Sequence, residues 1–454
     1  MQPGDEAMST FATDPRRSMS HGADRRLLPL LAGLASIPAG MAMALALYRY
    51  PPAPAIAVGA GAGLVCLLAL TLANLHAAVA LGVVLLGVVA FEPAPSDAVF
   101  FAVIAVSAVT GRLHLRAAPG PAIGILVVLG ALNVISAMQV ADPQRAALFF
   151  SITMYLAIFA LWLPSYVVSR PRAQLILRAY VVAAVTSAVI GVAALLALIP
   201  GAELFTESSR ARALFQDPNV FGPFLIPALL MVLEEIPHPR LLRSGTVAKA
   251  VLSAILAVGV LFSYSRGAWL NLAVGLAVMV GVLALRRGGA RQALAFVAVA
   301  SCAAAVVVAI VIATGAGGFL AERARPQTYD TQRFSGQRAG LQPAEEYPLG
   351  AGPGQFESIA GISAHSTYAR VVGEQGFLGL AALIAFLGYT LLAAIRNAAA
   401  GRSTFGIGSA ALLGAWCGML ANSAVIDTLH WRHLWLVAGL IWAGAALSWR
   451  RSSS

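Results

Sequence analysis

Long apolar runs separated by short polar connections extend along almost the whole chain. A helix that crosses a bilayer needs about 20 predominantly apolar residues, and runs of this kind recur up to the last residues of the sequence. The pattern predicts an all-α, polytopic integral membrane protein with about 12–14 transmembrane helices. We expect them near residues 27–48, 55–72, 75–91, 98–111, 121–138, 146–168, 176–199, 219–236, 247–263, 267–285, 291–314, 375–395, 404–422 and 433–449.

The composition is typical of a membrane protein. Hydrophobic residues make up 59% of the 454 positions and charged residues 11%, whereas a soluble domain carries about 25% charged residues. So few charges exclude a soluble domain and a disordered chain. The net charge of +11 does not indicate nucleic-acid binding, because the basic residues lie in short connections between apolar runs, where they set membrane topology.

The distribution of basic residues predicts which connections face the cytoplasm. With a cytoplasmic N-terminus, most of the 30 Lys and Arg residues fall in inner connections, as the positive-inside rule requires. Most of the exceptions on the outer face fall in three places, which are Arg210 with Arg212, Arg266, and the arginines of the segment 315–374. Because topology does not explain these exceptions, they are the first candidates for a functional site.

One connection is much longer than the others. The outer segment 315–374 is too short for a complete soluble domain and too long for an idle connector, so we expect it to cap the outer face with short helices. The expected parts are a disordered cytoplasmic tail at 1–26, an N-terminal transmembrane bundle at 27–314, the outer loop at 315–374, C-terminal transmembrane helices at 375–449 and a cytoplasmic tail at 450–454.

The first candidate motif lies at an expected helix start on the outer face. Asp217 followed by Pro218 is typical of an N-cap and a first helical residue, and the free N–H groups of such a start form an anion site. Arg210 and Arg212 lie just upstream and add forked donors suited to phosphate oxygens. In the simpler interpretation, Asp217 and Pro218 only begin a helix, and the arginines contact lipid headgroups.

The second candidate is a tight turn between two apolar runs, Tyr264-Ser265-Arg266. An arginine at membrane depth costs about 2.5–3.5 kcal/mol on insertion scales, so it usually faces a polar cavity and has a function. The alternative is that Arg266 extends to the membrane interface beside Trp269.

The third candidate is the long outer segment. Arg333 and Arg338 fall in a stretch that predicts a short amphipathic helix. The glycine-rich stretch 350–354 offers backbone N–H groups to a phosphate, although glycine and proline in a loop usually indicate only turns.

His365 is the candidate proton acceptor of this segment. Imidazole has an ordinary pKa near 6.5 and accepts a hydroxyl proton at neutral pH, although a lone loop histidine is more often only solvated. The rival bases are Glu345, Glu346, Glu357 and Glu374. A last outer cluster supplies supporting polar structure around the same site and consists of Asp427, His430, Arg432 and His433.

In this order, the motifs resemble those of the O-antigen ligase and polymerase superfamily of bacterial envelope polysaccharide assembly. The resemblance covers roughly residues 200–395 and rests on Arg210 ahead of Pro218-Asn219, Ser265-Arg266-Gly267, Pro348-Leu349-Gly350, Gly352-Pro353-Gly354-Gln355-Phe356, His365-Ser366-Thr367-Tyr368 and Glu374-Gln375-Gly376-Phe377-Leu378-Gly379. Three features depart from the family pattern. Arg212 is a second nearby arginine, although spacing favours Arg210, and Ser366 stands where relatives often have Asn. The number of expected spans also exceeds the twelve common among family members.

The resemblance implies a glycosyltransferase with the C-type membrane fold, in the bacterial inner membrane with its active site facing the periplasm. The implied donor is a glycan on undecaprenyl diphosphate, with no metal, cofactor or nucleotide sugar. The arginines would bind the diphosphate, and His365 would deprotonate or orient the attacking hydroxyl, with inversion of the anomeric carbon. The implied catalytic residues are His365, Arg266 and Arg210, and the implied substrate-binding residues are Arg212, Asn219, Arg333, Arg338, Tyr368 and Glu374.

The acceptor stays open at this point. A ligase would transfer the glycan to lipid A-core in lipopolysaccharide biosynthesis, and a polymerase would transfer it to a growing O-antigen or exopolysaccharide chain. A protein hydroxyl is a third possibility. A transporter of lipid-linked sugars would instead place charged residues inside several spans, which are nearly free of charge here, and a non-catalytic scaffold would leave the outer arginines unexplained.

Overall fold

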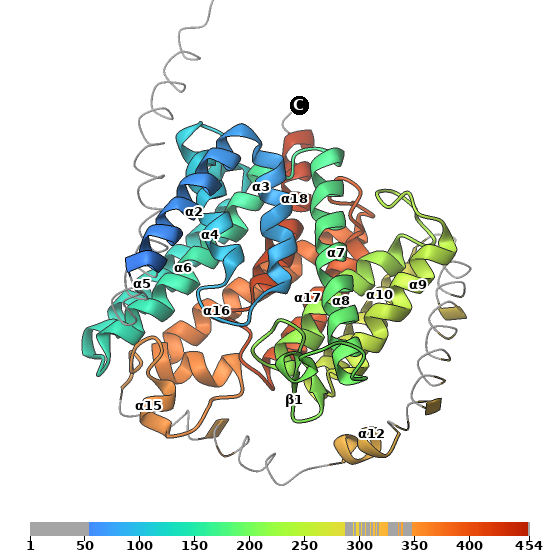
Figure 1. Cartoon of the computed structure of the whole chain (residues 1–454). Coiled ribbons are helices and arrows are strands. Elements are labelled where there is room, and N and C mark those ends of the chain that lie inside the picture. Colours follow the sequence, from blue (N-terminus) through green and yellow to red (C-terminus); the bar gives the residue numbers. More distant parts are fainter. Residues whose placement is uncertain are drawn as a thin grey trace, which may run out of the picture.

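A computed structural model describes residues 54–286, 347–452 and scattered positions between these ranges (Figure 1). The expected tail at 1–26, the expected span at 27–48 and most of the expected span at 291–314 lie outside the described residues. The division of the chain into five parts therefore stays a prediction.

The described part is mostly helical, and the prediction of an all-α polytopic membrane protein is confirmed. Two short strands, β1 (Thr206–Glu207) and β2 (Arg210–Ala211), form an antiparallel hairpin in which Glu207 lies opposite Arg210. The α-helices are α2 (Pro54–Ala73), α3 (Leu75–Val84), α4 (Pro95–Val109), α5 (Gly120–Ser136), α6 (Pro143–Tyr166), α7 (Arg170–Leu195), α8 (Pro218–Glu234), α9 (Thr246–Phe262), α10 (Arg266–Leu285), α12 (Gly317–Ala324), α15 (Phe356–Ala360), α16 (Thr367–Ala399), α17 (Ser409–Ser423) and α18 (Arg432–Ser452). Short 3₁₀ helices are η1 (Leu85–Gly87), η2 (Leu115–Ala117), η3 (Ala137–Gln139) and η4 (Ala202–Phe205).

Four of the described helices, α6, α7, α10 and α16, are long and apolar enough to cross a membrane by themselves. Shorter apolar helices, among them α4, α5, α8 and α9, pack with them. The exact number of spans stays a prediction.

The bundle has two ends, which we name by their place in Figure 1. At the lower end, α6, α8, α10, α16 and α18 begin, and β1, α12 and α15 lie there; at the upper end these long helices finish, beside the C-terminus. Polar N-caps fix several of the lower starts. The Asp142, Asp217 and Ser265 side chains accept hydrogen bonds from the backbone N–H groups at the starts of α6, α8 and α10.

Glycines let the central helices approach closely. A Cβ on Gly414 of α17 would lie 2.4 Å from the Gly275 carbonyl oxygen of α10, and a Cβ on Gly418 would lie 2.4 Å from the Asn271 carbonyl oxygen. Small residues at such contacts allow helix backbones to pack tightly inside a membrane. These contacts hold α10 closely against α17 in the middle of the two helices.

The start of α16 differs from the expected start at 375. Ser366 accepts a hydrogen bond from the Ala369 N–H and begins the helix at Thr367. Gly376, with a φ of 67°, interrupts the helix where the apolar run begins. Hydrophobicity therefore identifies only the part of α16 beyond this break, because the part before it is polar and ion-paired.

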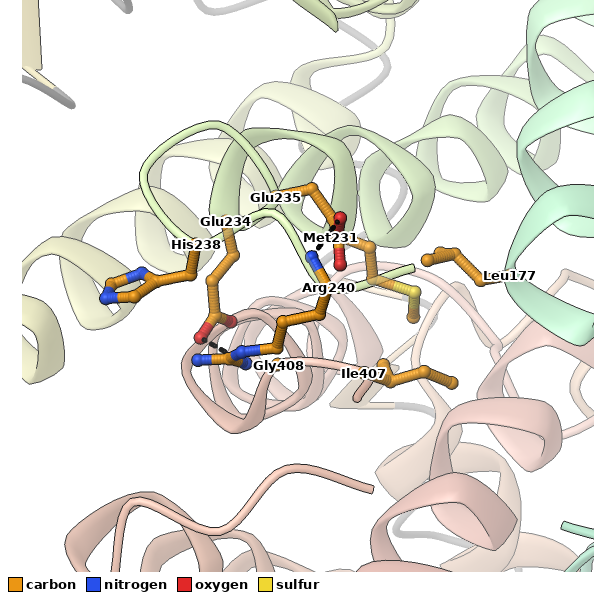
Figure 2. Close-up of a pocket in the computed structure, with 8 residues that line it drawn as sticks. All are labelled: Leu177, Met231, Glu234, Glu235, His238, Arg240, Ile407 and Gly408. Atoms are coloured by element: carbon orange, nitrogen blue, oxygen red, sulfur yellow. Dashed lines mark hydrogen bonds and ion pairs between the residues drawn. The ribbon is translucent and has the colours of Figure 1, made fainter. Parts of the chain in front are cut away.

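A cluster of charged residues closes the upper end at the finish of α8 (Figure 2). The buried Glu234 carboxylate accepts a 2.7 Å hydrogen bond from the Ala411 N–H and lies 3.5 Å from Arg286 and 3.8 Å from Arg240. The adjacent Glu235 carboxylate accepts hydrogen bonds from the N–H groups of residues 240–242. The single lysine of the sequence, the buried Lys249, donates to the Glu235 carbonyl oxygen at 2.7 Å.

Candidate functional site

Arg210 connects two segments of the lower end. Its Nε donates to the Ser263 carbonyl oxygen at 3.0 Å, and its Nη2 donates to Asn219 Oδ1 at 2.8 Å. Asn219 is itself held by Asp217, whose carboxylate accepts from the Asn219 N–H at 2.8 Å. The guanidinium therefore bridges the start of α8 and the turn between α9 and α10.

Arg212 follows directly on the same hairpin segment. The hydrogen bonds that the structure records for Arg212 go only to nearby main chain. Its two Nη atoms donate to the carbonyl oxygens of Gln216 and Leu204, at 3.4 and 3.2 Å. The two arginines that the sequence left as alternatives thus have different surroundings, and it is Arg210 that contacts the α9–α10 turn.

The α9–α10 turn presents Arg266 at the first position of α10. Tyr264 has a φ of 46°, and Ser265 caps the helix by accepting from the Ala268 N–H at 3.3 Å. Gly222 of α8 lies so close that a Cβ there would stand 2.5 Å from Ser263 Oγ. Arg266 Nη1 donates to the Arg325 carbonyl oxygen, just after α12, at 3.4 Å, so the side chain reaches toward the long outer segment.

His365 directly precedes Ser366, the cap of α16, in the same way that Tyr264 precedes Ser265, the cap of α10. Its φ is 43°, and the next residue, Ser366, caps α16 and donates to the Ser423 carbonyl oxygen at the end of α17 at 3.4 Å. Gln337 of the outer segment donates to the carbonyl oxygens of both His365 and Ala424, each at 3.2 Å.

These three segments meet through α17. A Cβ on Gly267, next to Arg266, would lie 2.5 Å from the Asn422 Oδ1 of α17, and the following residue, Ser423, accepts the hydrogen bond from Ser366 beside His365. The Arg210, Arg266 and His365 segments therefore lie at one end of the bundle and share contacts. Their chemical roles stay predictions.

One protein family matches the part of the chain that contains two of these segments. Residues 251–384 match a family model described as O-antigen ligase. This segment is an O-antigen ligase domain. It extends from α9 to the middle of α16 and includes Arg266 and His365, whereas Arg210 lies before it. No curated protein matches the chain.

The match gives the class of this segment. The chain is a membrane protein whose residues 251–384 match the O-antigen ligase family, which comprises membrane enzymes of the ligase and polymerase type. Which of these two reactions it performs is not decided by the match.

Within the O-antigen ligase domain, the carboxylates of Glu374 and Glu357 face an arginine. Arg370 lies 3.1 Å from the Glu374 carboxylate, forms an ion pair with Glu357 and lies 2.8 Å from the Asp427 carboxylate. Arg145 of α6 contacts the other oxygen of Glu357 at 2.6 Å. Glu345 and Glu346, the other two rival bases, lie outside the described residues.

The sequence reasoning missed this network. Its central residue, Arg370, is buried, and the three carboxylates come from α15, α16 and the connection before α18. The spacing of Arg370 and Glu374, four residues apart on one helix, was the available signal. The network ties the outer loop to the start of α16, next to His365.

The glycine-rich stretch does not offer its N–H groups to a phosphate as expected. The Ala351 N–H donates to the Gly373 carbonyl oxygen at 3.0 Å, and the Gly352 N–H donates to the Glu374 carbonyl oxygen at 2.9 Å. The break at Gly376 leaves these two carbonyl groups without helical donors, and the loop supplies the missing N–H donors. The glycine-rich stretch therefore stabilises the start of α16.

The cluster before α18 borders a cavity of about 140 Å³ that Gln216 also lines. Arg432 donates to the Asp97 carboxylate at 2.7 and 2.5 Å. His430 Nε2 lies 3.0 Å from Thr153 Oγ1, and burial lowers the pKa of its imidazole below the ordinary value. That this cluster supports the site stays a prediction.

The other candidate residues have the following places. Tyr368 donates from its hydroxyl to the Leu420 carbonyl oxygen at 3.1 Å, which holds α16 against α17. Arg338 is exposed and neighbours Gln337. Arg333 lies outside the described residues. Among the described residues, no His, Cys, Asp or Glu side chains are grouped as metal ligands; the absence of a metal from the reaction stays a prediction.

Proposed function

We propose that this protein transfers a glycan from undecaprenyl diphosphate to a hydroxyl acceptor at the periplasmic face of the bacterial inner membrane. One observation carries the proposal: the Arg210, Arg266 and His365 segments come together at the lower end through the α9–α10 turn and the end of α17. The O-antigen ligase match over residues 251–384 supports the same class of reaction.

The arginines would act on the leaving group. As the bond between the anomeric carbon and the diphosphate oxygen breaks, negative charge develops on the diphosphate, and forked guanidinium donors stabilise that charge. Arg210 is fixed on two sides by Ser263 and Asn219, so little reorganisation is needed when the donor binds. Arg266 approaches from the start of α10, and Arg212, Arg333 and Arg338 would assist at the edges of the site.

His365 would act on the acceptor. The acceptor oxygen forms a bond with the anomeric carbon while its proton passes to the imidazole, and undecaprenyl diphosphate leaves. Displacement from the opposite side inverts the anomeric carbon. We assign Tyr368 and Glu374 to positioning: the first bonds to α17 and the second to Arg370, so both fix the start of α16 beside His365.

The placement of charge supports a fixed site over a path for translocation. The buried charged residues of the described helices lie within the first two or last two turns, as Glu234, Lys249, Arg370, Glu374 and Arg432 do. A transporter of lipid-linked sugars would line its path with polar residues at mid-membrane depth.

For the acceptor we propose lipid A-core, the ligase reaction, with polymerisation of an O-antigen or exopolysaccharide chain as the alternative. The test is the surface-glycan gel pattern of a deletion strain, with and without the wild-type gene. Loss of the whole ladder from lipid A-core supports the ligase. Core with one repeat identifies a polymerase, and unchanged lipopolysaccharide with missing secreted polymer identifies exopolysaccharide synthesis.

A separate experiment tests on which side of the membrane the candidate site lies. Reporter fusions after residue 365 are expected to be active only as periplasmic reporters, and fusions in the connection between α8 and α9 only as cytoplasmic ones. A cytoplasmic His365 would overturn the proposed function altogether.

A further inference from the structure

A cavity of about 510 Å³ opens at the upper end, far along the helices from the candidate site. It is lined by the start of α3, the connection after α4, the end of α6 and the start of α7. Binding pockets for small molecules and headgroups typically measure about 300–1,000 Å³, so the cavity has room for a group much larger than a single ion.

The cavity is positively charged. Arg112 and Arg172 line it together with His76 and His114, and none of the residues lining it is Asp or Glu. Among the described residues, no carboxylate pairs with Arg112 or Arg172. Arg240 and Arg286 at the same end are different, because both lie beside the Glu234 carboxylate.

Arg172 is held in place without using all its donors. One Nη donates to the Tyr166 carbonyl oxygen at 3.1 Å, and the guanidinium lies 5.4 Å from the centre of the Tyr166 ring. The hydroxyl of the same tyrosine lies 2.8 Å from His76 Nδ1. A guanidinium carries five N–H donors, so this arrangement orients Arg172 and leaves further donors for an anion in the cavity.

Apolar surface adjoins the cavity. Leu72, near the end of α2, is 64% exposed, and Val109, the last residue of α4, is 79% exposed. Gly111 lines the cavity two residues after Val109, and Leu75 lines it three residues after Leu72. On membrane helices, exposed apolar side chains of this kind contact lipid chains.

We propose that this cavity binds the phosphate headgroup of an anionic phospholipid, with Arg112 and Arg172 on the phosphate and the acyl chains against Leu72 and Val109. Basic pockets between transmembrane helices suit phosphate headgroups because the arginines gain a partner that the protein itself does not provide. The inference does not depend on the proposed glycan transfer.

The test uses the full-length protein purified in a neutral detergent and titrated with phosphatidylglycerol, phosphatidylcholine or inorganic phosphate. Bound lipid is counted by native mass spectrometry, and the thermal unfolding midpoint is recorded. The variants are Arg112→Gln, the double variant with Arg172→Gln, and the control Arg178→Gln. Arg178 is an exposed arginine further along α7 that does not line the cavity.

Phosphatidylglycerol is expected to bind the wild type at least about tenfold more tightly than phosphatidylcholine, and each lost arginine should weaken its binding about fivefold. Arg178→Gln should stay within about twofold, because it removes the same charge outside the cavity. Arg172→Gln also removes the bond to Tyr166, so Arg112→Gln, which breaks no such bond, is the deciding variant.

Equal binding of the two lipids, or unchanged phosphatidylglycerol binding by Arg112→Gln, would overturn the proposal. If inorganic phosphate stabilises the wild type as strongly as phosphatidylglycerol, through the same two arginines, the ligand is a soluble phosphate and the lipid assignment is wrong.

Discussion

The Glu234 cluster of the upper end and the turns before α10 and α16 at the lower end are built differently, although neither end is uniform: Phe405 at the upper end has a positive φ, and Arg370 at the lower end is buried and ion-paired. At the upper end, Glu234 and Glu235 are buried and surrounded by donors, and the space they enclose holds no cavity for a water molecule. At the lower end, Tyr264 and His365 have positive φ angles immediately before the serines that cap α10 and α16. Such a conformation costs of the order of 1–3 kcal/mol for a non-glycine residue.

The cluster at the upper end stabilises the fold, whereas the residues proposed for catalysis lie at the lower end. The closed upper cluster fixes the finish of α8 against α9, α10 and α17, and this rigid packing supports strained turns at the opposite end of the same helices. The lower end then presents Arg266 and His365 from helix starts whose direction is fixed. Variants at the two ends should therefore separate activity from folding.

The largest effect is expected at the lower end. His365→Ala and Arg266→Ala should each lower glycan transfer by about 10²–10⁴-fold, because one removes the proton acceptor and the other a charge on the leaving diphosphate. The thermal unfolding midpoint and the amount of protein in the membrane should stay close to wild type. Transfer near the wild-type rate by either variant would contradict the proposed site.

Arg210→Ala and Arg212→Ala form a matched pair for the next effect. Arg210 bridges Ser263 and Asn219, whereas the recorded bonds of Arg212 go to its own loop. We expect Arg210→Ala to lower kcat about 10²–10³-fold and Arg212→Ala to lower it less than about threefold. Initial rates with a lipid-linked glycan measure both, and equal losses would show that the structural distinction between them has no functional meaning.

At the upper end, the expected effect is on stability. Glu235→Ala should lower the free energy of unfolding by about 3 kcal/mol, because it leaves Lys249 and three N–H groups without their partner. Thermal unfolding in detergent measures the change, and transfer per folded molecule should stay normal. The control is Glu203→Ala at an exposed carboxylate, which should change the unfolding free energy by less than about 0.5 kcal/mol.

The smallest effect is expected from a variant that relieves backbone strain in the turn between β1 and β2. Ser208 and Ser209 connect β1 to β2 with φ angles of 47° and 59°, the pattern of a type I′ turn, which favours glycine. Ser209→Gly should therefore raise the free energy of unfolding by about 1 kcal/mol and leave Arg210 in place, so transfer should not change. A lower unfolding midpoint would argue against strain in this hairpin.

Much of the fold was predictable from the sequence, because a bilayer imposes apolar helices of near-constant length. Asp217-Pro218 predicted the start of α8 correctly, since the cap and the proline are local signals. The predicted start of α16, at residue 375, lies eight residues after the observed start at Thr367. Hydrophobicity reports contact with lipid, whereas the first turns of this helix carry Arg370, which contacts the Glu357 and Asp427 carboxylates from elsewhere in the chain.

The candidate site was predictable only in its parts. Arg210 and Arg266 drew attention because arginines on the outer face oppose the topology rule, and His365 because its imidazole can accept a hydroxyl proton at neutral pH. The family resemblance placed the three residues in one site. The Arg370 network and the amides of Ala351 and Gly352 were not predictable, since their partners are far away in sequence and depend on tertiary packing.

The break at Gly376 also constrains how the protein folds. The carbonyl groups of Gly373 and Glu374 receive their hydrogen bonds from the loop at 351–352, and a Cβ at position 376 would lie 2.2 Å from the Pro348 carbonyl oxygen. The break removes the helical donors that these carbonyl groups would otherwise have, and a buried carbonyl group without a donor is costly. The loop and the first turns of α16 therefore depend on each other and are expected to fold as one unit.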